Sequence, residues 1–366
     1  MQAHISEYEP MRLGPLGKLR IAQVAPLSES VPPKLYGGTE RIVAVLTDEL
    51  VRQGHAVTLF ASGDSRTAAT LVPVCEKAQR LAGCVDPLSA HMLMIEHVAQ
   101  RAKDFDIIHY HVAPLHFPLA RRMDTAHLTT MHGRLDLPDL VPLYEEFCEL
   151  PLVSISDAQR SPLPRQNWVG TVHHGFPERD FCFHPEPGVY LAFLGRISRE
   201  KRVDRAIAIA KACGWPLKIA AKVDPTDVQY FKNEIAPLMD HPLIDYIGEI
   251  TDAEKSAFLG NAHALLFPID WPEPFGLVMI ESLACGTPVV AYRGGSVAEV
   301  VEDGVTGFVV ADMDQAIDAV RRVHTLDRRA CRDAFTRRFT AARMASAYVR
   351  LYRQLTSSAA GAGIVA

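Results

Sequence analysis

The sequence predicts an α/β protein built from two Rossmann-like domains, each with a doubly wound parallel sheet. Short apolar runs, typical of buried strands, alternate with stretches in which apolar residues recur at helical spacing. A polar, loop-rich stretch over residues 174–188 separates two such series. An amphipathic stretch over residues 344–355 predicts a final helix that must pack against other parts of the protein.

Length and composition agree with two soluble domains. A chain of 366 residues is too long for one ordinary hydrophobic core. With 48% hydrophobic and 22% charged residues, it has the composition of a globular protein. Its net charge of −5 gives no general attraction to nucleic acid or to an anionic membrane. Because of this charge, we expect no nucleic-acid partner. Because no apolar run is long enough to cross a bilayer, we also expect no integral membrane segment.

The cysteines and the N-terminal stretch bear on location. Seven scattered cysteines without metal-ligand spacing indicate reduced core residues, and hence a cytoplasmic protein. Residues 1–18 lack the apolar core of a signal peptide. We interpret them as a flexible leader, with a lid or an oligomer contact as the alternative.

The first series predicts an N-terminal domain over residues 19–183. A strand at residues 19–25 leads through a proline-rich loop to Gly37-Gly38 and a helix that ends at Gly54. The glycine pair could approach a phosphate, but it is neither a dinucleotide fingerprint nor a P-loop, and a simple turn is the alternative. Other expected elements are a helix over 88–102 and strands at 56–61, 106–111, 127–133, 152–156 and 168–172.

The second series predicts a C-terminal domain over residues 184–338. Its expected strands lie at residues 190–195, 217–221, 244–248, 264–267, 289–291 and 307–310. Residues 339–366 would hold the final helix and a tail that is disordered from residue 356.

One helix is predicted between the buried strands that flank residues 270–290. Pro272, Pro274 and Gly276 mark its start, and Gly286 follows its end, where a left-handed backbone suits glycine. The helix therefore begins beyond the carboxyl end of a parallel strand, where open α/β sheets bind ligands. Its first N–H groups suit a phosphate.

Two glutamates indicate which way a ligand would lie in this predicted site. Glu273 precedes the helix and Glu281 lies inside it. If a diphosphate rests on the helix N-terminus, one carboxylate can accept hydrogen bonds from sugar hydroxyls and the other from a ribose. The alternative is that Glu273 is a helix-start charge favoured by the dipole and Glu281 an ordinary solvated position.

A cationic pair follows the first strand of the second series. Arg196 comes directly after Gly195, and Lys201 lies five residues further on. Cations there suit a diphosphate leaving group, since they stabilise the charge that grows as the bond to it breaks. A solvated loop with local ion pairs is the alternative.

Taken together, these motifs resemble family 4 of the retaining GT-B glycosyltransferases, which use nucleotide sugars. The resemblance covers residues 19 to about 355 and implies a GT-B fold, in which two Rossmann-like domains face each other across a cleft and the C-terminal helix crosses back to the first domain. It rests on an ordered series of motifs, namely Gly37-Gly38, 106–111, 131–133, Gly195-Arg196 with Lys201, Glu273 with Glu281, 286–290 and 299–307.

The resemblance also implies roles for individual residues. The group expected to act in the transfer comprises His132 against the donor sugar, Arg196 and Lys201 on the diphosphate, and Glu273 on the sugar hydroxyls. The group expected to bind the rest of the donor comprises Gly37, Gly38, Phe275, Gly276 and Leu277 for the diphosphate, Ile247, Gly248 and Glu249 for the nucleobase, and Glu281 for the ribose. His111 and Asp157 are weaker candidates.

The implied reaction moves a sugar from a nucleotide diphosphate sugar to an acceptor hydroxyl with retention of configuration. It would follow a front-face path without a protein nucleophile, cofactor or metal; the acidic pair at residues 104–106 is interpreted as a chance match. Two alternatives stay open, a nucleotide-sugar 2-epimerase on the same fold and a non-catalytic nucleotide-sugar binding module.

Donor and acceptor are less well defined. His174 stands where the family often has asparagine, and Trp271 precedes the site where serine is common. A UDP-sugar is the first expectation for the donor, with adenosine and guanosine as the alternative nucleosides. Residues 64–100 lack a strongly basic amphipathic helix, which favours a soluble acceptor over a lipid.

Overall fold

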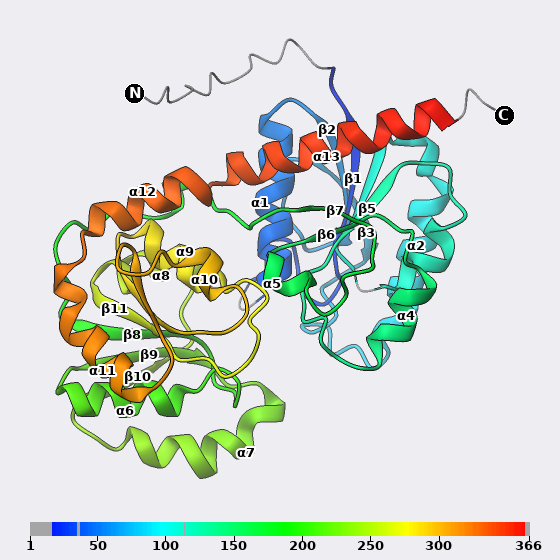
Figure 1. The fold of residues 1–366 in the computed structure, drawn as a ribbon. Helices are drawn as coiled ribbons and strands as arrows, with labels where there is room; N and C mark the ends of the chain where they lie inside the picture. Colours follow the sequence, from blue (N-terminus) through cyan, green and yellow to red (C-terminus); the bar gives the residue numbers. More distant parts are fainter. Residues whose placement is uncertain (1–16, 35–36, 113, 363–366) are drawn as a thin grey trace, which may run out of the picture.

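A computed structural model describes residues 17–34, 37–112 and 114–362, which form two lobes with one parallel sheet each (Figure 1). The N-terminal sheet has the order β3-β2-β1-β4-β5-β6-β7, so the chain starts in the middle and winds outward in both directions. Its strands are β1 (Arg20–Val24), β2 (Ala56–Ser62), β3 (Thr70–Cys75), β4 (Ile107–Tyr110), β5 (His127–Thr130), β6 (Leu152–Ser154) and β7 (Trp168–Thr171).

The C-terminal sheet repeats this winding with the order β10-β9-β8-β11-β12-β13. All of its pairs are parallel, and β8, β11 and β12 lie in the middle and are largely buried. Its strands are β8 (Tyr190–Arg196), β9 (Leu217–Lys222), β10 (Ile244–Gly248), β11 (Ala262–Phe267), β12 (Val289–Tyr292) and β13 (Gly307–Val310). Two doubly wound sheets confirm the predicted fold class.

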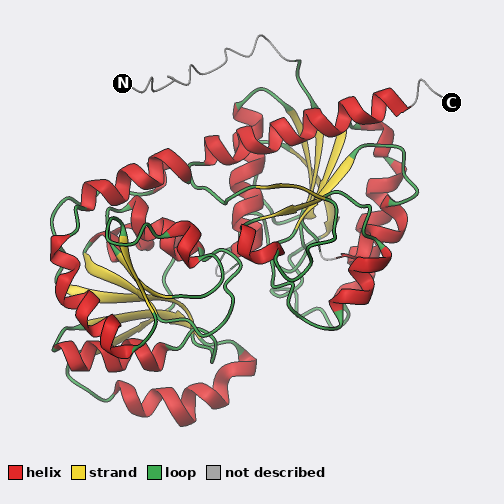
Figure 2. Cartoon of the chain, viewed as in Figure 1, coloured by secondary structure: helices red, strands yellow, loops and turns green. Residues whose placement is uncertain are grey.

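Helices cover both faces of each sheet and supply the other half of each core (Figure 2). In the N-terminal lobe they are α1 (Gly38–Arg52), α2 (Pro87–Gln100), α3 (Phe117–Ala120), α4 (Leu140–Glu146) and α5 (Asp157–Arg160). In the C-terminal lobe they are α6 (Val203–Cys213), α7 (Val228–Tyr230), α8 (Asp252–Gly260), α9 (Leu277–Ala284), α10 (Val297–Val300), α11 (Met313–Arg322) and α12 (Arg328–Arg338). The last helix, α13 (Ala341–Ala362), lies on the N-terminal lobe against α1.

The chain crosses between the lobes twice, at neighbouring places. The N–H of Phe176 donates to the carbonyl of Phe339 at 2.9 Å, and the N–H of Ala341 donates to the carbonyl of Phe176 at 2.9 Å. Gly175 is needed here, because a Cβ at this position would lie 2.4 Å from the carbonyl oxygen of Thr340. The return of α13 to the first lobe, as expected for this fold, thus forms a paired connection beside the outgoing one.

Three expectations from the sequence need comment. Strand β3 was not predicted, since it is a half-exposed edge strand that contains Pro73 and shows no buried run. The tail was expected to be disordered from residue 356, but α13 continues to Ala362. Except for its last two residues, the predicted leader lies outside the described residues.

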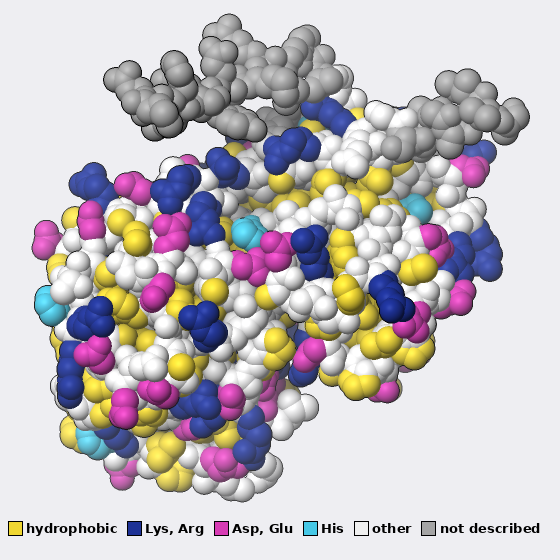
Figure 3. All heavy atoms as spheres, viewed as in Figure 1, with side chains coloured by type: hydrophobic (Ala, Val, Ile, Leu, Met, Phe, Trp, Pro, Cys, Tyr) yellow, Lys and Arg dark blue, Asp and Glu magenta, His cyan; other side chains and the backbone are white. Residues whose placement is uncertain are grey.

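Other expectations concern membranes and thiols. Within the part of the chain that the structure describes, no helix has both the length and the apolar composition needed to cross a membrane. All seven cysteines are free thiols, but only Cys285 and Cys331 are buried, so the expectation that the cysteines are core residues is wrong for the other five. Acidic and basic side chains are interspersed over the face shown in Figure 3, which agrees with the small net charge.

Candidate active site

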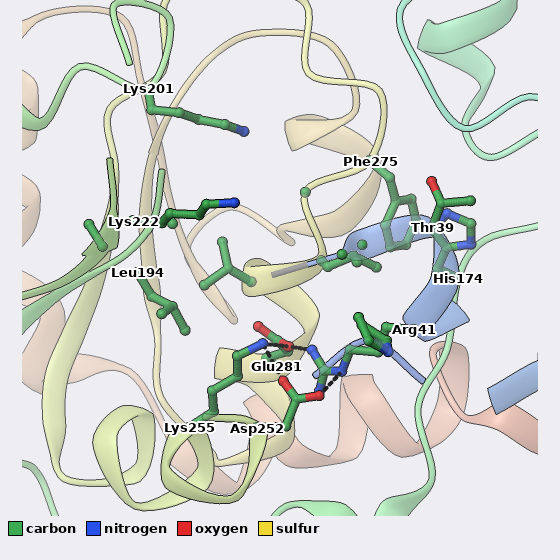
Figure 4. A pocket seen from close by; sticks show the side chains of 18 of the residues that line it. Thr39, Arg41, His174, Leu194, Lys201, Lys222, Asp252, Lys255, Phe275 and Glu281 are labelled. Atoms are coloured by element: carbon green, nitrogen blue, oxygen red, sulfur yellow. Dashed lines mark hydrogen bonds and ion pairs between the residues drawn. The ribbon is translucent and has the colours of Figure 1, made fainter. Parts of the chain in front are cut away.

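A cavity of about 390 Å³ lies between the two lobes and brings together residues from both. The N-terminal lobe contributes the start of α1 and the loops after β5 and β7, and the C-terminal lobe contributes the loops after β8, β9, β10 and β11 together with α9 (Figure 4). These loops follow the carboxyl ends of parallel strands, as predicted for a ligand site in such sheets. Of the predicted residues, Gly37, Gly38, His132, Lys201, Glu249, Glu273, Phe275, Gly276, Leu277 and Glu281 line the cavity.

The start of α9 is set by backbone geometry that requires glycine. Gly276 caps the helix with a φ of 79°, and a Cβ there would lie 2.6 Å from the methyl group of Met279. After the helix, Gly286 has a φ of 83°, as its position in the sequence predicted. The N–H of Met279, the third residue of α9, donates to the carbonyl of the cap residue Gly276 at 3.0 Å. The two residues before it, Leu277 and Val278, line the cavity, and N–H groups at the start of a helix would stabilise an anion there.

Glu273 is held in a fixed position beside a cation. Its Oε2 atom accepts hydrogen bonds from Nζ of Lys201 and, at 3.1 Å, from the indole N–H of Trp271. Nζ of Lys201 also lies 5.0 Å from the centre of the Trp271 ring. The backbone of Glu273 is fixed as well, because its carbonyl accepts from the N–H of Ser296 at 2.9 Å. The predicted sugar-binding carboxylate therefore has one oxygen engaged by the protein.

Arg196 lies next to the cavity and bonds elsewhere in this structure. Its guanidinium donates to Glu200 at 2.6 Å and to Asp224 at 3.3 Å. To contact a ligand, it would have to exchange these carboxylates for phosphate oxygens. Lys222, at the end of β9, does line the cavity, although only its place at a strand end pointed to it in the sequence.

Glu281 joins the two lobes through a buried ion cluster. Its Oε1 atom accepts from Arg41 of α1, and Nζ of Lys255 lies 3.6 Å from the same oxygen. Arg41 and Lys255 also pair with Asp252, at 3.1 and 2.6 Å (Figure 4). Burial would raise the pKa of Glu281, but the charges of Lys255 and Arg41 outweigh it, and the pKa is lowered. The carboxylate is therefore ionised at neutral pH.

Arg41 was not among the predicted residues. It lies one turn into the helix that follows Gly37-Gly38, and its guanidinium stacks 4.1 Å above the ring of Phe176 in the interlobe connection. Its position after the glycine pair was the available signal. What the sequence could not show is that this helix faces Glu281 of the other lobe.

Two histidines of the N-terminal lobe, His132 and His174, form part of the cavity wall. His132 lines the cavity, and its ring stacks against His174 with 5.3 Å between centroids. Burial lowers the pKa of His132 to about 3 and holds the pKa of His174 well below its usual range, so both rings are neutral. His111 lies behind His132 and contacts it through Nδ1 at 2.9 Å. His174 had been noted only as a departure from the family pattern.

The other predicted residues lie at or beyond the edge of the cavity. Ile247 and Gly248 belong to β10 and directly precede Glu249. Asp157 is in α5 at a different groove, where its carboxylate accepts from Thr171 at 2.8 Å and pairs with Arg160.

Comparison with known proteins identifies the chain. A family model described as Glycosyltransferase Family 4 matches residues 36–151, and a second, Glycosyl transferases group 1, matches residues 178–334. The chain belongs to the family 4-type glycosyltransferases of the GT-B fold. The first match lies in the N-terminal lobe of the glycosyltransferase and the second in the C-terminal lobe, and both lobes line the cavity.

Similar proteins cover most of the enzyme. It is 25% identical over 338 residues to an alpha-maltose-1-phosphate synthase of Mycobacterium tuberculosis, covering 80% of this chain and 86% of that one. AviGT4, a glycosyltransferase involved in avilamycin A biosynthesis, superposes with a TM-score of 0.69 at 25% identity, over 93% of this chain and 98% of AviGT4. HepE of Anabaena, solved in complex with UDP and glucose, gives a TM-score of 0.68 at 16% identity over 92% and 100% of the two chains and shows a shared fold.

Proposed function

We propose that this glycosyltransferase moves a hexosyl group from a nucleoside diphosphate sugar to an acceptor hydroxyl, with retention of anomeric configuration. One observation carries the proposal. Three lysine and arginine side chains of the C-terminal lobe and α1, namely Lys201, Lys222 and Arg41, converge with Glu273 and Glu281 on a cavity at the N-terminus of α9. A ligand that carries two phosphates between two polyhydroxylated rings matches that arrangement of charge.

The roles proposed for the residues follow the cavity from end to end. The diphosphate would lie on the first N–H groups of α9, near Gly37-Gly38, with Lys201 and Lys222 as cations, and Arg196 reaching it after rearrangement. Glu281 would accept from the ribose, and the segment around Glu249 would contact the base. Glu273 would accept from hydroxyls of the transferred sugar, which places that sugar between Lys201 and His132.

The transfer step proposed needs no protein nucleophile. The bond between the anomeric carbon and the phosphate oxygen breaks, and both electrons stay on that oxygen. The acceptor oxygen attaches to the anomeric carbon from the same face, and its proton passes to the departing phosphate oxygen. Lys201, Lys222 and the α9 N-terminus stabilise the growing negative charge. Because Glu273 bonds Lys201 and Trp271 through one oxygen, we propose that it positions the sugar rather than attacks it.

A donor screen tests the proposal. The full chain is incubated with UDP-glucose, ADP-glucose and GDP-mannose, and release of nucleoside diphosphate is measured with and without a panel of soluble saccharides. A UDP-sugar is the first expectation, supported by the fold shared with HepE. Retention is read from the anomeric proton coupling of the product. Isomerised sugar formed without an acceptor would indicate an epimerase, and binding without any release would indicate a binding module.

Metal independence is tested in the same assay. We expect EDTA to leave the rate unchanged within about twofold, because lysines and helix N–H groups supply the positive charge that a metal ion would otherwise bring. A loss of activity that Mg²⁺ or Mn²⁺ restores would contradict this part of the proposal.

A further inference from the structure

A chain of hydrogen bonds runs from helix α13 through the N-terminal sheet to the ring of His132. Nε2 of Gln23, on β1, donates to the hydroxyl of Tyr352 at 3.1 Å, and Oε1 of Gln23 lies 2.7 Å from Nε2 of His111. Nδ1 of His111 in turn lies 2.9 Å from Nε2 of His132. Gln23, His111 and Tyr352 are at most 4% exposed, so water does not compete for these bonds.

With the Gln23 amide in this orientation, counting protons along the chain gives the tautomer of each ring. An amide oxygen only accepts hydrogen bonds, so Nε2 of His111 must carry the proton. In a neutral imidazole the other nitrogen is then an acceptor, and Nδ1 of His111 receives its bond from Nε2 of His132. The proton of His132 is thereby on Nε2, and its Nδ1 carries a lone pair. Burial keeps the pKa of His111 well below its usual range, which is consistent with a neutral ring.

The other end of the chain is anchored on α13. Because the oxygen of Tyr352 accepts from Gln23, its single proton is left for Nδ1 of His109, 2.7 Å away. Nε2 of His109 then donates to the hydroxyl of Thr130 at 2.7 Å. If the amide of Gln23 were turned over, every donor in the chain would become an acceptor, and His132 would present an N–H at Nδ1. The chain therefore changes state as one unit.

We propose that Gln23, His111 and Tyr352 are positioning residues that keep an unprotonated Nδ1 of His132 available to the cavity, where it accepts a hydrogen bond from a sugar or acceptor hydroxyl. The identity of the ligand rests on the proposed function. His132 lines the cavity, and no described residue bonds its Nδ1. Phosphate oxygens accept hydrogen bonds, as an unprotonated Nδ1 does. This tautomer therefore favours a hydroxyl at Nδ1 of His132 and disfavours the diphosphate there.

The test measures the tautomer directly and needs no donor. The full-length protein is labelled with ¹⁵N-histidine, long-range ¹H–¹⁵N spectra are recorded at pH 7.5, and the His132 signals are assigned by their loss in His132→Asn. We expect the Nε2–H pattern for both His111 and His132 in the wild type. Gln23→Glu should preserve it, because a carboxylate also accepts from His111.

Two variants and a matched control complete the test. Gln23→Leu removes the bond to His111, and Tyr352→Phe frees the Gln23 amide to turn over; in both, His132 should show a mixed or Nδ1–H pattern. Tyr348→Phe removes a buried hydroxyl from the same helix, bonded to Thr130 at 2.8 Å, and should keep the wild-type pattern. Once a donor is found, Tyr352→Phe should lower kcat about tenfold with KM within about twofold.

Either of two results overturns the inference. One is an Nδ1–H pattern for His132 in the wild type. The other is an unchanged His132 pattern in a folded Gln23→Leu or Tyr352→Phe variant. Should both variants fail to fold, the wild-type and Gln23→Glu spectra still decide the tautomer. Failure of the donor screen would leave these spectra unaffected, so the two proposals fail separately.

Discussion

The carboxylates of Glu273 and Glu281 are each bound by cations in a way that leaves room for a ligand. The bonds from Lys201 and Trp271 converge on Oε2 of Glu273, and those from Arg41 and Lys255 converge on Oε1 of Glu281. Pairing avoids the cost of an isolated buried charge. The second oxygen of each carboxylate bonds no described residue and is available to hydroxyl groups of a substrate.

Replacement of Glu273 tests the role of its charge in transfer. Glu273→Gln keeps the shape of the side chain but weakens both the pairing with Lys201 and the acceptance of sugar hydroxyls. We expect kcat/KM to fall about 100-fold, which corresponds to about 2.7 kcal/mol of transition-state stabilisation. Steady-state release of nucleoside diphosphate measures it. Glu254→Gln, in the exposed first turn of α8, is the control and should change kcat/KM by less than about twofold.

A second substitution at the residue scale tests the contact between the lobes. Arg41→Met leaves Glu281 buried with only Lys255 as a cationic partner, so we expect the free energy of unfolding to fall by about 3 kcal/mol. Urea denaturation measures this change. The double variant Arg41→Met/Glu281→Gln should be more stable than Arg41→Met alone, because the uncompensated charge is gone. Additive losses would show that the two side chains do not interact.

Residue types and spacing predicted part of this site and could not predict the rest. Glu273, Lys201 and Glu281 were found because they flank strand ends and a helix start in one lobe. Arg41 and His174 enter the site from the other lobe, and their importance depends on how the lobes face each other. Arg41 follows the Gly37-Gly38 pair, but spacing along the chain carries no information on its distance from Glu281. Its part in the site, like that of His174, is therefore visible only in the three-dimensional structure.

At the scale of elements, the start of α9 depends on one glycine. Gly276→Ala places a Cβ 2.6 Å from Met279 and forces a left-handed backbone on alanine. We expect a loss of about 2 kcal/mol in the free energy of unfolding and about tenfold weaker donor binding, because the helix N-terminus must shift. Chemical denaturation and calorimetric titration measure the two effects.

A matched glycine separates backbone strain from steric displacement. Gly214, after α6, has a φ of 66° and open space around its Cβ position. Gly214→Ala should cost about 1 kcal/mol through the backbone alone and leave donor binding unchanged. Equal effects of the two substitutions on binding would contradict a special role for the α9 start.

The elements predicted best were those buried on both faces. Strands such as β8, β11 and β12 are continuous apolar runs and were located to within a few residues. Strand β3 lies at the sheet edge, has no fully buried residue and contains a proline, so its sequence resembles a loop. Elements are thus predictable to the extent that burial imposes a pattern on them.

For the whole molecule, several contacts join the two lobes around the cavity. The paired connections meet at Phe176 and Thr340, and the hydroxyl of Ser156 donates to the carbonyl of Pro274 at 2.7 Å near the start of α9. The cation and carboxylate cluster around Arg41 adds a third contact. Relative movement of the lobes would therefore change the cavity and the ion cluster together.

Four neutral histidines between the sheet and the cavity make the stability of the whole molecule depend on pH. Burial lowers the pKa of His132 to about 3 and holds the pKa values of His109, His111 and His174 well below 6.5. In the unfolded chain the same rings take up protons near pH 6.5. Between that pH and the folded pKa values the unfolded state binds more protons, so stability is complete above about pH 7 and falls as the pH decreases.

His174→Asn isolates the contribution of one ring. This variant removes a single titrating group whose Nδ1 has no hydrogen-bond partner among the described residues, and the carboxylates that also titrate are unchanged. Between pH 6 and pH 5, the free energy of unfolding should fall less steeply in the variant than in the wild type, by about 1 kcal/mol per pH unit. Above pH 7.5 both curves should be flat with respect to histidine. Urea denaturation across this range measures the slopes, and equal slopes between pH 6 and pH 5 would mean that His174 is protonated equally in the folded and unfolded chains.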